Sequence, residues 1–253
     1  MQTSSPQPLK SETKLSVIIP VYNQEKRVGV SLARIKRVLG STLQAYEIVV
    51  VNDGSTDKTL DVLQEEQEKD PSIHIVSYPV NRGKGYAVRE GVMRSKGSTV
   101  IFTDGDLDVS PEVIKDYIDE LGSFDLVVAS KRHPLSRVKA PQSRKFLSRA
   151  FSLVVRLLVG IKLKDTQAGL KAGNGDALRL IFSVMQVRRY AFDVELFVIA
   201  DLLQLRIKEM PIEIELDRRF KVRDIARMFV DVSGIAYRHR VRHWYANQSK
   251  GLK

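Results

Sequence analysis

Leu15-Ser-Val-Ile-Ile-Pro-Val21 is a short, almost uninterrupted apolar run, and a helical pattern at Glu25–Leu39 separates it from a second run, Glu47-Ile-Val-Val-Val51. The alternation continues to about Ser130 with three more helical patterns and three more apolar runs: Asp57–Lys69, Ile73–Tyr78, Gly85–Lys96, Thr99–Phe102, Ser110–Leu121 and Leu126–Ala129. Apolar strands separated by helices are typical of a parallel sheet that helices cover on both faces. This part of the chain therefore predicts a Rossmann-like three-layer α/β/α fold with a mostly parallel sheet.

The composition is that of an ordinary globular protein with an excess of positive charge. Of the 253 residues, 43% are hydrophobic and 28% are charged, which suits one large domain. The chain has no cysteine, which excludes disulfide frameworks, thiolate metal sites and cysteine nucleophiles. The net charge of +11 favours an anionic partner, namely nucleic acid, a phosphate-bearing substrate or an anionic membrane surface.

The sequence divides into three segments that differ in composition and in residue pattern. Residues 1–14 are polar and lack the apolar core of a signal peptide, so we expect a flexible tail. Residues 15–217 carry the α/β pattern, which includes a further strand at Ile207–Leu216, and residues 218–253 form a basic amphipathic segment. No stretch reaches the roughly 18 uninterrupted apolar residues of a membrane span.

Polar and charged residues follow the predicted strands. In open α/β sheets, ligands bind beyond the carboxyl ends of the strands, so these residues are the candidates for a binding site. They are Pro20, Tyr22, Asn23 and Glu25 after the first strand, Asp53 after the second, Lys84 after the third, an aspartate cluster after the fourth, and Lys131 with Arg132 after the fifth.

The aspartate cluster is Asp104-Gly-Asp106-Leu-Asp108. Clustered carboxylates repel one another and commonly pair with a cation, and their hard oxygens suit Mg²⁺ or Mn²⁺. An EF-hand is excluded because Val109 and Lys115 occupy the places where that loop needs glycine and glutamate. Helix capping ahead of Pro111 and a solvated acidic turn remain as alternatives.

Two glycine-containing segments carry weaker signals. Asn52-Asp-Gly-Ser55 is typical of a turn, and equally places the Asp53 carboxylate to accept a hydrogen bond from a nucleoside. Asn81-Arg-Gly-Lys-Gly85 opens a helix, where backbone amides and Lys84 can hold a phosphate, although it is neither a Walker A sequence nor a full dinucleotide fingerprint.

A basic stretch follows the fifth strand. Residues 131–162 contain nine Lys and Arg residues and no Asp or Glu, and residues 145–160 read as an amphipathic helix. Basic amphipathic helices commonly lie on anionic membranes, where each basic group contributes about 1 kcal/mol. The residues between the charges are aliphatic rather than the stacking aromatics of single-strand binding, which favours a membrane over nucleic acid.

Taken together, the motifs Ser16–Asn23, Val50–Asp57, Asn81–Gly85 and Asp104–Asp108 resemble the family 2 glycosyltransferases, which have a GT-A fold. Four later segments resemble the polyprenyl-phosphate branch of that family, which includes dolichyl-phosphate β-glucosyltransferases and dolichol-phosphate mannose synthases: Ser130-Lys-Arg-His, Ser143–Ser148, Asp165–Lys171 and Ala191–Leu196.

This resemblance implies an inverting, metal-dependent transfer of a sugar from a nucleotide-sugar to polyprenyl or dolichyl phosphate, with Mg²⁺ or Mn²⁺ as cofactor. UDP-glucose is the favoured donor, ahead of UDP-N-acetylglucosamine and GDP-mannose, and a polysaccharide or other hydroxyl acceptor is the alternative. The protein would work as a peripheral protein on the cytoplasmic face of a membrane, held by interfacial amphipathic helices and without nucleic acid as a partner. The sequence carries no signal of an oligomeric state.

The resemblance also implies roles for individual residues. The residues implied in binding the nucleotide-sugar are Pro20, Tyr22, Glu25, Asp53, Lys84, Asp104 and Gln167. The metal would be held by Asp104, Asp106 and Asp108, and the last of these stands where the mannose synthases often carry glutamine. Arg132 and Arg144 would hold the acceptor phosphate.

The implied catalytic residues are Asp106, Arg132, Arg144 and Glu195. Glu195 lies close to where other members carry a catalytic base. A phosphate acceptor is already an anion, so the resemblance implies in-line attack without an obligatory base.

Overall fold

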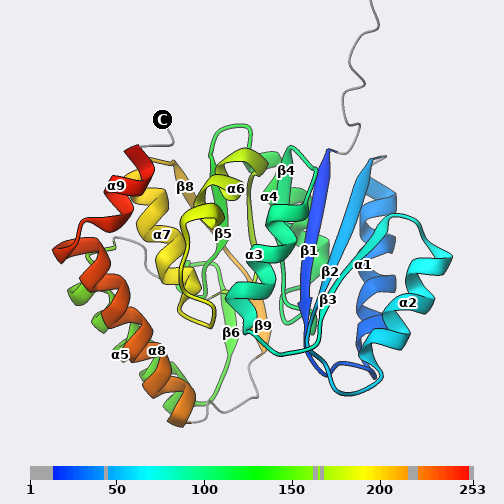
Figure 1. The fold of residues 1–253 in the computed structure, drawn as a ribbon, viewed down its shortest axis with the longest axis horizontal. Coiled ribbons are helices and arrows are strands. Elements are labelled where there is room, and N and C mark those ends of the chain that lie inside the picture. The colour runs from blue at the N-terminus through cyan, green and yellow to red at the C-terminus, as the bar shows by residue number, and fades with distance from the viewer. Residues whose placement is uncertain (1–13, 43–44, 162–164, 166–167, 216–221, 251–253) are drawn as a thin grey trace, which may run out of the picture.

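The computed structural model describes residues 14–42, 45–161, 165, 168–215 and 222–250. Within them, seven strands form one sheet in the order β3-β2-β1-β4-β7-β5-β8 (Figure 1). The strands are β1 (Leu15–Val21), β2 (Tyr46–Asp53), β3 (Ile73–Tyr78), β4 (Thr99–Phe102), β5 (Leu126–Ala129), β7 (Lys171–Asn174) and β8 (Ile207–Met210). Only β7 runs antiparallel to its neighbours, β4 and β5, so the predicted mostly parallel sheet is confirmed.

Helices cover both faces of this sheet. One face carries α1 (Val28–Thr42), α2 (Thr59–Lys69) and α4 (Ile114–Glu120), which follows the short helix η1 (Pro111–Val113). The other carries α3 (Lys84–Arg94), α6 (Gly175–Val184), α7 (Phe192–Leu202), α8 (Val222–Ala236) and α9 (Trp244–Lys250). α5 (Gln142–Val159) packs beside α8. None of these helices combines the length and apolar character needed to cross a bilayer, as far as the described residues go.

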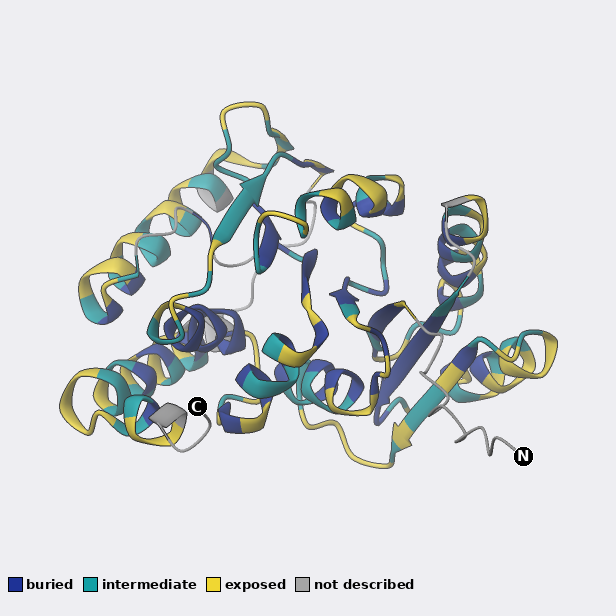
Figure 2. Ribbon diagram, turned by 90° about the horizontal axis from the view of Figure 1, so that it is seen from above, coloured by how far each residue is buried: buried dark blue, intermediate teal, exposed yellow. Residues whose placement is uncertain are grey.

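The core lies in two apolar layers, one on each face of the sheet (Figure 2). Side chains alternate between the two faces of a strand, so Ile18 packs beside α3 while Val17 and Ile19 pack beside α1. All three are at most 1% exposed, which explains why β1 reads as continuously apolar. α8 and α9 contribute Val232, Ile235 and Tyr245 to the same core as α3.

The strand expected at Ile207–Leu216 is divided in the structure. β8 ends at Met210, and β9 (Glu213–Glu215) pairs instead with β6 (Arg137–Lys139) in a separate two-stranded sheet. Pro211 lies between the two strands, and proline has no amide hydrogen for a strand ladder. The predicted tail at residues 1–14 lies outside the described residues except for Lys14.

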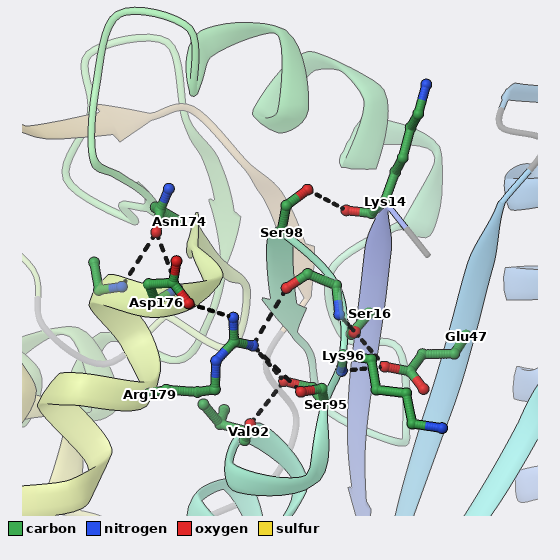
Figure 3. Close-up of polar contacts among 12 residues, drawn as sticks. Lys14, Ser16, Glu47, Val92, Ser95, Lys96, Ser98, Asn174, Asp176 and Arg179 are labelled. Atoms are coloured by element: carbon green, nitrogen blue, oxygen red, sulfur yellow. Dashed lines mark hydrogen bonds and ion pairs between the residues drawn. The ribbon is translucent and has the colours of Figure 1, made fainter. Parts of the chain in front are cut away.

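A buried polar network closes the amino-terminal edge of the sheet (Figure 3). The carboxylate of Glu47 in β2 accepts hydrogen bonds from the Ser16 hydroxyl and the Lys96 amide, both at 2.6 Å. Arg179 of α6 donates to the carbonyl oxygens of Ser95 and Gly97, each at 3.3 Å. These contacts fix the turn between α3 and β4, and the chemically reactive groups lie at the opposite edge.

Candidate active site

Residues that follow β4 and β5 line a cavity of about 750 Å³ together with residues of α3, α5, α7 and α8. Its polar side includes Lys84, Asp104, Asp108, Lys131, Arg132 and Asp193. Lys84 is the first residue of α3, and Asp104 comes two residues after β4. The sheet therefore brings together the residues predicted to follow its third, fourth and fifth strands, as expected for an open α/β sheet.

Lys84 and Asp104 form an ion pair at the centre of this polar side. Burial opposes the charged form of Lys84, but the nearby carboxylates of Asp104, Asp193 and Asp106 outweigh it and raise the lysine pKa above its ordinary value. Lys84 is therefore a permanent cation, suited to meeting a phosphate group.

Asp193 is a cavity residue that the sequence reasoning missed. Its carboxylate lies 2.8 Å from the ammonium of Lys171, and both side chains are at least 93% buried. Burial raises the pKa of Asp193, against the opposing effect of Lys171 and Lys84. The resemblance covers the segment Ala191–Leu196, which contains both acids, but it implies a role for Glu195 only.

Glu195, for which the resemblance implies a catalytic role, is not among the residues that line the cavity. Two residues along an α-helix turn the side chain by roughly 200°, so Glu195 faces away from Asp193 and the cavity. Its fully buried carboxylate accepts hydrogen bonds from the Gln186 and Val187 amides at 3.0 and 2.7 Å, and from the Tyr245 hydroxyl. Burial raises the pKa of Glu195, and the Tyr245 hydrogen bond partly offsets this.

Asp53 also has a local structural partner. Its two carboxylate oxygens accept hydrogen bonds from the Arg82 amide at 2.8 Å and the Gly83 amide at 2.9 Å. The next residue, Gly54, has a φ of 67°, and a Cβ there would lie 2.4 Å from the Asn81 nitrogen. Asp53 therefore holds the loop that precedes Lys84. The contact with the nucleoside that the resemblance implies stays a prediction.

Tyr22 and Glu25 lie together in a second, smaller cavity of about 310 Å³, which Asp57 also lines. The Glu25 carboxylate accepts a hydrogen bond from the Lys58 amide at 3.0 Å, and the Asp57 carboxylate accepts one from the Glu25 amide at 3.2 Å. Pro20, also implied in nucleoside binding, is the partly buried sixth residue of β1.

The aspartate cluster forms a tight turn after β4. The Leu107 amide donates to the Asp104 carbonyl at 3.1 Å, and Leu107 has a φ of 53°. Asp104 and Asp108 line the large cavity. Among the described residues, no three acids or histidines are grouped closely enough to hold a metal ion by themselves. The set predicted from Asp104, Asp106 and Asp108 is thus not a preformed three-carboxylate site.

Lys131 and Arg132 lie in the basic part of the cavity lining, to which Lys145 and Arg149 of α5 also contribute. Arg132 donates to the Ser148 carbonyl of α5 at 3.1 Å, and burial lowers its pKa. Lys131, which the sequence reasoning noted after β5 without assigning it a role, lies 3.2 Å from Asp165. Burial lowers the pKa of Lys131 despite that carboxylate. The side chain of Arg144, and Gln167 altogether, lie outside the described part of the structure.

Part of the cavity wall is apolar. Leu147 and Phe151 of α5, Val138 of β6, Ile214 of β9 and Met228 of α8 line it. A ligand with a hydrocarbon part gains free energy by covering such a wall.

The chain matches the model of glycosyl transferase family 2 over residues 16–182. It is 32% identical to a dolichyl-phosphate beta-glucosyltransferase of Trichomonas vaginalis, over 92% of this chain and 74% of that protein. It is 33% identical to the dolichyl-phosphate beta-glucosyltransferase of Mus musculus, over 95% of this chain and 80% of the mouse protein.

Solved structures agree on the fold. Glucosyl-3-phosphoglycerate synthase from Mycobacterium tuberculosis, crystallised with Mn²⁺ and UDP-glucose, superposes with a TM-score of 0.65 at 20% identity, over 90% of this chain and 79% of that chain. The same enzyme crystallised with UDP gives a TM-score of 0.66 at 21% identity, over 90% and 80% of the two chains. This likeness supports the predicted GT-A-like fold. The family model and the sequence relatives show that this chain belongs to glycosyl transferase family 2.

Proposed function

We propose that this protein transfers glucose from UDP-glucose to a polyprenyl phosphate such as dolichyl phosphate, with inversion at the anomeric carbon, at the cytoplasmic surface of a membrane. The observation that carries the proposal is the cavity, in which a lysine and aspartate centre, a pair of basic residues and an apolar wall meet. The relatives named above act on dolichyl phosphate, and their name supports the same acceptor class here.

On the donor side, Lys84 would bind a diphosphate oxygen, and the loop held by Asp53 positions it. Mg²⁺ usually takes one or two carboxylates and completes its shell with substrate phosphates, which fits an aspartate cluster that is not a closed site. Asp104 and Asp106 would hold Mg²⁺ or Mn²⁺. When bound, the ion would neutralise charge on the departing diphosphate.

On the acceptor side, Lys131 and Arg132 would hold the lipid phosphate against the donor, with Arg144 as a further predicted ligand. One phosphate oxygen forms a bond to the anomeric carbon while the bond from that carbon to the diphosphate breaks. The nucleophile is anionic, so no side chain has to remove a proton. The position of Glu195 away from the cavity supports a mechanism of orientation and charge stabilisation.

The apolar wall supports a lipid acceptor over a glycan. The first isoprene units next to the phosphate could lie along Leu147, Phe151 and Met228, where each buried methylene contributes about 0.8 kcal/mol. A polysaccharide hydroxyl acceptor would leave this wall uncovered.

The outer face of α5 supports docking on an anionic membrane. Phe146, Leu153 and Leu157 are 75%, 56% and 67% exposed, and the exposed Arg149 and Arg156 lie on the same helical face. On α8, which packs beside α5, Val230 is 72% exposed. A face that mixes apolar and basic side chains is typical of interfacial helices. Because Leu147 and Phe151 lie on the cavity side of α5, a lipid can pass along this helix into the site.

A donor screen tests the proposal. Purified protein with Mn²⁺ or Mg²⁺ is mixed with vesicles that contain a short polyprenyl phosphate and one radiolabelled nucleotide-sugar, and label extracted into organic solvent is counted. We expect label with UDP-glucose, none after EDTA treatment, and none when the polyprenyl alcohol without phosphate replaces the acceptor. Transfer of label to a water-soluble glycan, with none to the lipid phosphate, would contradict the proposed acceptor.

A further inference from the structure

The amino-terminal end of α3, which presents Lys84, is packed against the loop between α6 and α7. The Tyr86 amide donates to the Arg188 carbonyl at 2.9 Å. A Cβ at Gly83 would lie 2.7 Å from that same carbonyl oxygen, and a Cβ at Gly85 would lie 2.6 Å from the Cβ of Phe192. The two glycines that flank Lys84 therefore make room for this loop, in addition to any approach of a phosphate.

Glu195 holds the loop from its other side. One carboxylate oxygen accepts hydrogen bonds from the amides of Gln186 and Val187. The side chain is fully buried, and a buried carboxylate costs several kcal/mol unless donors surround it. The two amides satisfy one oxygen and tie the start of the loop to the first turn of α7.

The second oxygen of Glu195 is bound by the C-terminal helices. It accepts a hydrogen bond from the hydroxyl of Tyr245 in α9, and the guanidinium of Arg238 lies 3.6 Å away. Arg238 belongs to the π-helical segment η2 (Tyr237–Val241) and donates to the Tyr245 oxygen at 2.8 Å. Tyr245 is 1% exposed, so this contact is part of the core.

We infer that Glu195, Tyr245 and Arg238 form a latch through which the C-terminal helices fix the loop at 185–190 and thereby position Lys84 for the donor diphosphate. This inference rests on the proposed role of Lys84. Glu195 is then a positioning residue that never touches substrate. The latch connects the donor site to the part of the chain beyond residue 182, where the family model ends.

A purely structural role would predict a different pattern of effects. If the three residues only stabilised the fold, loss of their contacts would lower the melting temperature and reduce the fraction of active enzyme. The apparent kcat would then fall, and the KM values for donor and acceptor would stay the same. If they position Lys84, weakening them raises the KM for the donor and leaves the KM for the acceptor unchanged.

Tyr245→Phe is the test, because it removes one hydroxyl and keeps the buried ring. Tyr117→Phe is the matched control: Tyr117 is also 1% exposed, lies in α4, and its hydroxyl has no hydrogen-bond partner in the described part of the chain. We expect Tyr245→Phe to raise the donor KM by at least about fivefold, the lower end of usual coupling between separate sites, with acceptor KM unchanged. Glu195→Gln, which keeps one acceptor oxygen, should fall between wild type and Glu195→Ala.

Two measurements without acceptor keep the test independent of the lipid assignment. Calorimetry gives the affinity for UDP, and hydrogen exchange follows the amides of Tyr86, Gln186 and Val187. The latch predicts weaker UDP binding and faster exchange at these amides in Tyr245→Phe, and neither change in Tyr117→Phe. Unchanged UDP affinity and exchange in Tyr245→Phe would overturn the inference, whichever acceptor the enzyme uses.

Discussion

Three lysines around the cavity share one arrangement, in which each ammonium pairs with an aspartate: Lys84 with Asp104, Lys171 with Asp193, and Lys131 with Asp165. A buried lysine tends to lose its proton, and a neighbouring carboxylate opposes that loss. The balance differs among them, because the pKa of Lys84 is raised and that of Lys131 is lowered. Lys131 is therefore the residue at which alkaline pH should first weaken binding of an anionic substrate.

The pH dependence of the acceptor KM tests this role of Lys131. Lysine is charged below its pKa, so a lowered pKa means that the acceptor KM rises with pH earlier than an ordinary lysine allows. Lys131→Arg should move that rise to higher pH, since arginine keeps its charge. Lys131→Met should raise the acceptor KM at least about tenfold near neutral pH, because hydrogen bonds to charged groups contribute about 1.5–3 kcal/mol. An acceptor KM profile that is the same in Lys131→Arg and wild type would contradict the assignment.

At this scale the sequence predicts residues at strand ends better than residues inside a buried helix. Lys84, Asp104 and Arg132 follow strands, and the topology of the sheet brings them to one cavity. Asp193 and Glu195 lie in α7, where every residue from Phe192 to Ala200 is buried. A helix that is buried all round has no polar stripe, so its sequence does not reveal which acid faces the site.

Among the elements, α1 and η1 are joined by a forked ion pair. Arg34 donates to both carboxylate oxygens of Glu112, at 3.1 and 2.8 Å. The hydrogen bonds from Arg34, together with that from Ser110, lower the pKa of Glu112 to about 2. The carboxylate is half exposed, so solvent screens the pair and its contribution to stability is small, about 0.2–1 kcal/mol.

The sign of the pH effect follows from the lowered pKa. The stabilisation by Glu112 is fully present above its ordinary value of 4.5 and is lost as pH falls toward about 2. The free energy of unfolding of Glu112→Gln, measured with urea, should therefore be lower than that of wild type near neutral pH. The two proteins should become equal as pH falls toward about 2. Glu215→Gln, which removes a more exposed pair at 3.8 Å with Lys139, is the control and should change little. A stability difference for Glu112→Gln that stays constant across this range would refute the linkage.

The strands that the sequence predicts are those with continuous β-branched runs. The sequence does not predict β7, because Lys171-Ala-Gly-Asn174 has only four residues, no β-branched side chain and a glycine. It becomes a strand because it fits between β4 and β5, which is a long-range packing effect. Local propensity cannot supply that information, nor the departure of β9 to a second sheet after Pro211.

At the scale of the whole molecule, the net charge of +11 has to be considered together with the positions of the exposed apolar side chains. The exposed apolar side chains of α5 and α8 lie next to basic residues. They are on the side of the molecule where the cavity has its apolar wall. α1 lies at the other end of the sheet and exposes a single large apolar side chain, Val30, at 74%. The face formed by α5 and α8 is therefore the one that we propose for docking, and Val30 on α1 is a matched site for comparison.

Leu153→Ser with Leu157→Ser tests docking through this face. Each exposed leucine that enters a bilayer gains up to about 1.5–3 kcal/mol, so the double variant should bind vesicles with anionic lipid at least about tenfold more weakly than wild type. Val30→Ser loses a similar exposed side chain on α1 and should bind as wild type does. Because Arg149 and Arg156 add an electrostatic part, binding of all forms should fall as salt is raised.

Co-sedimentation with vesicles measures these changes. Equal binding by the double variant and wild type would show that another surface meets the membrane, and that the lipid reaches the cavity by a path other than α5.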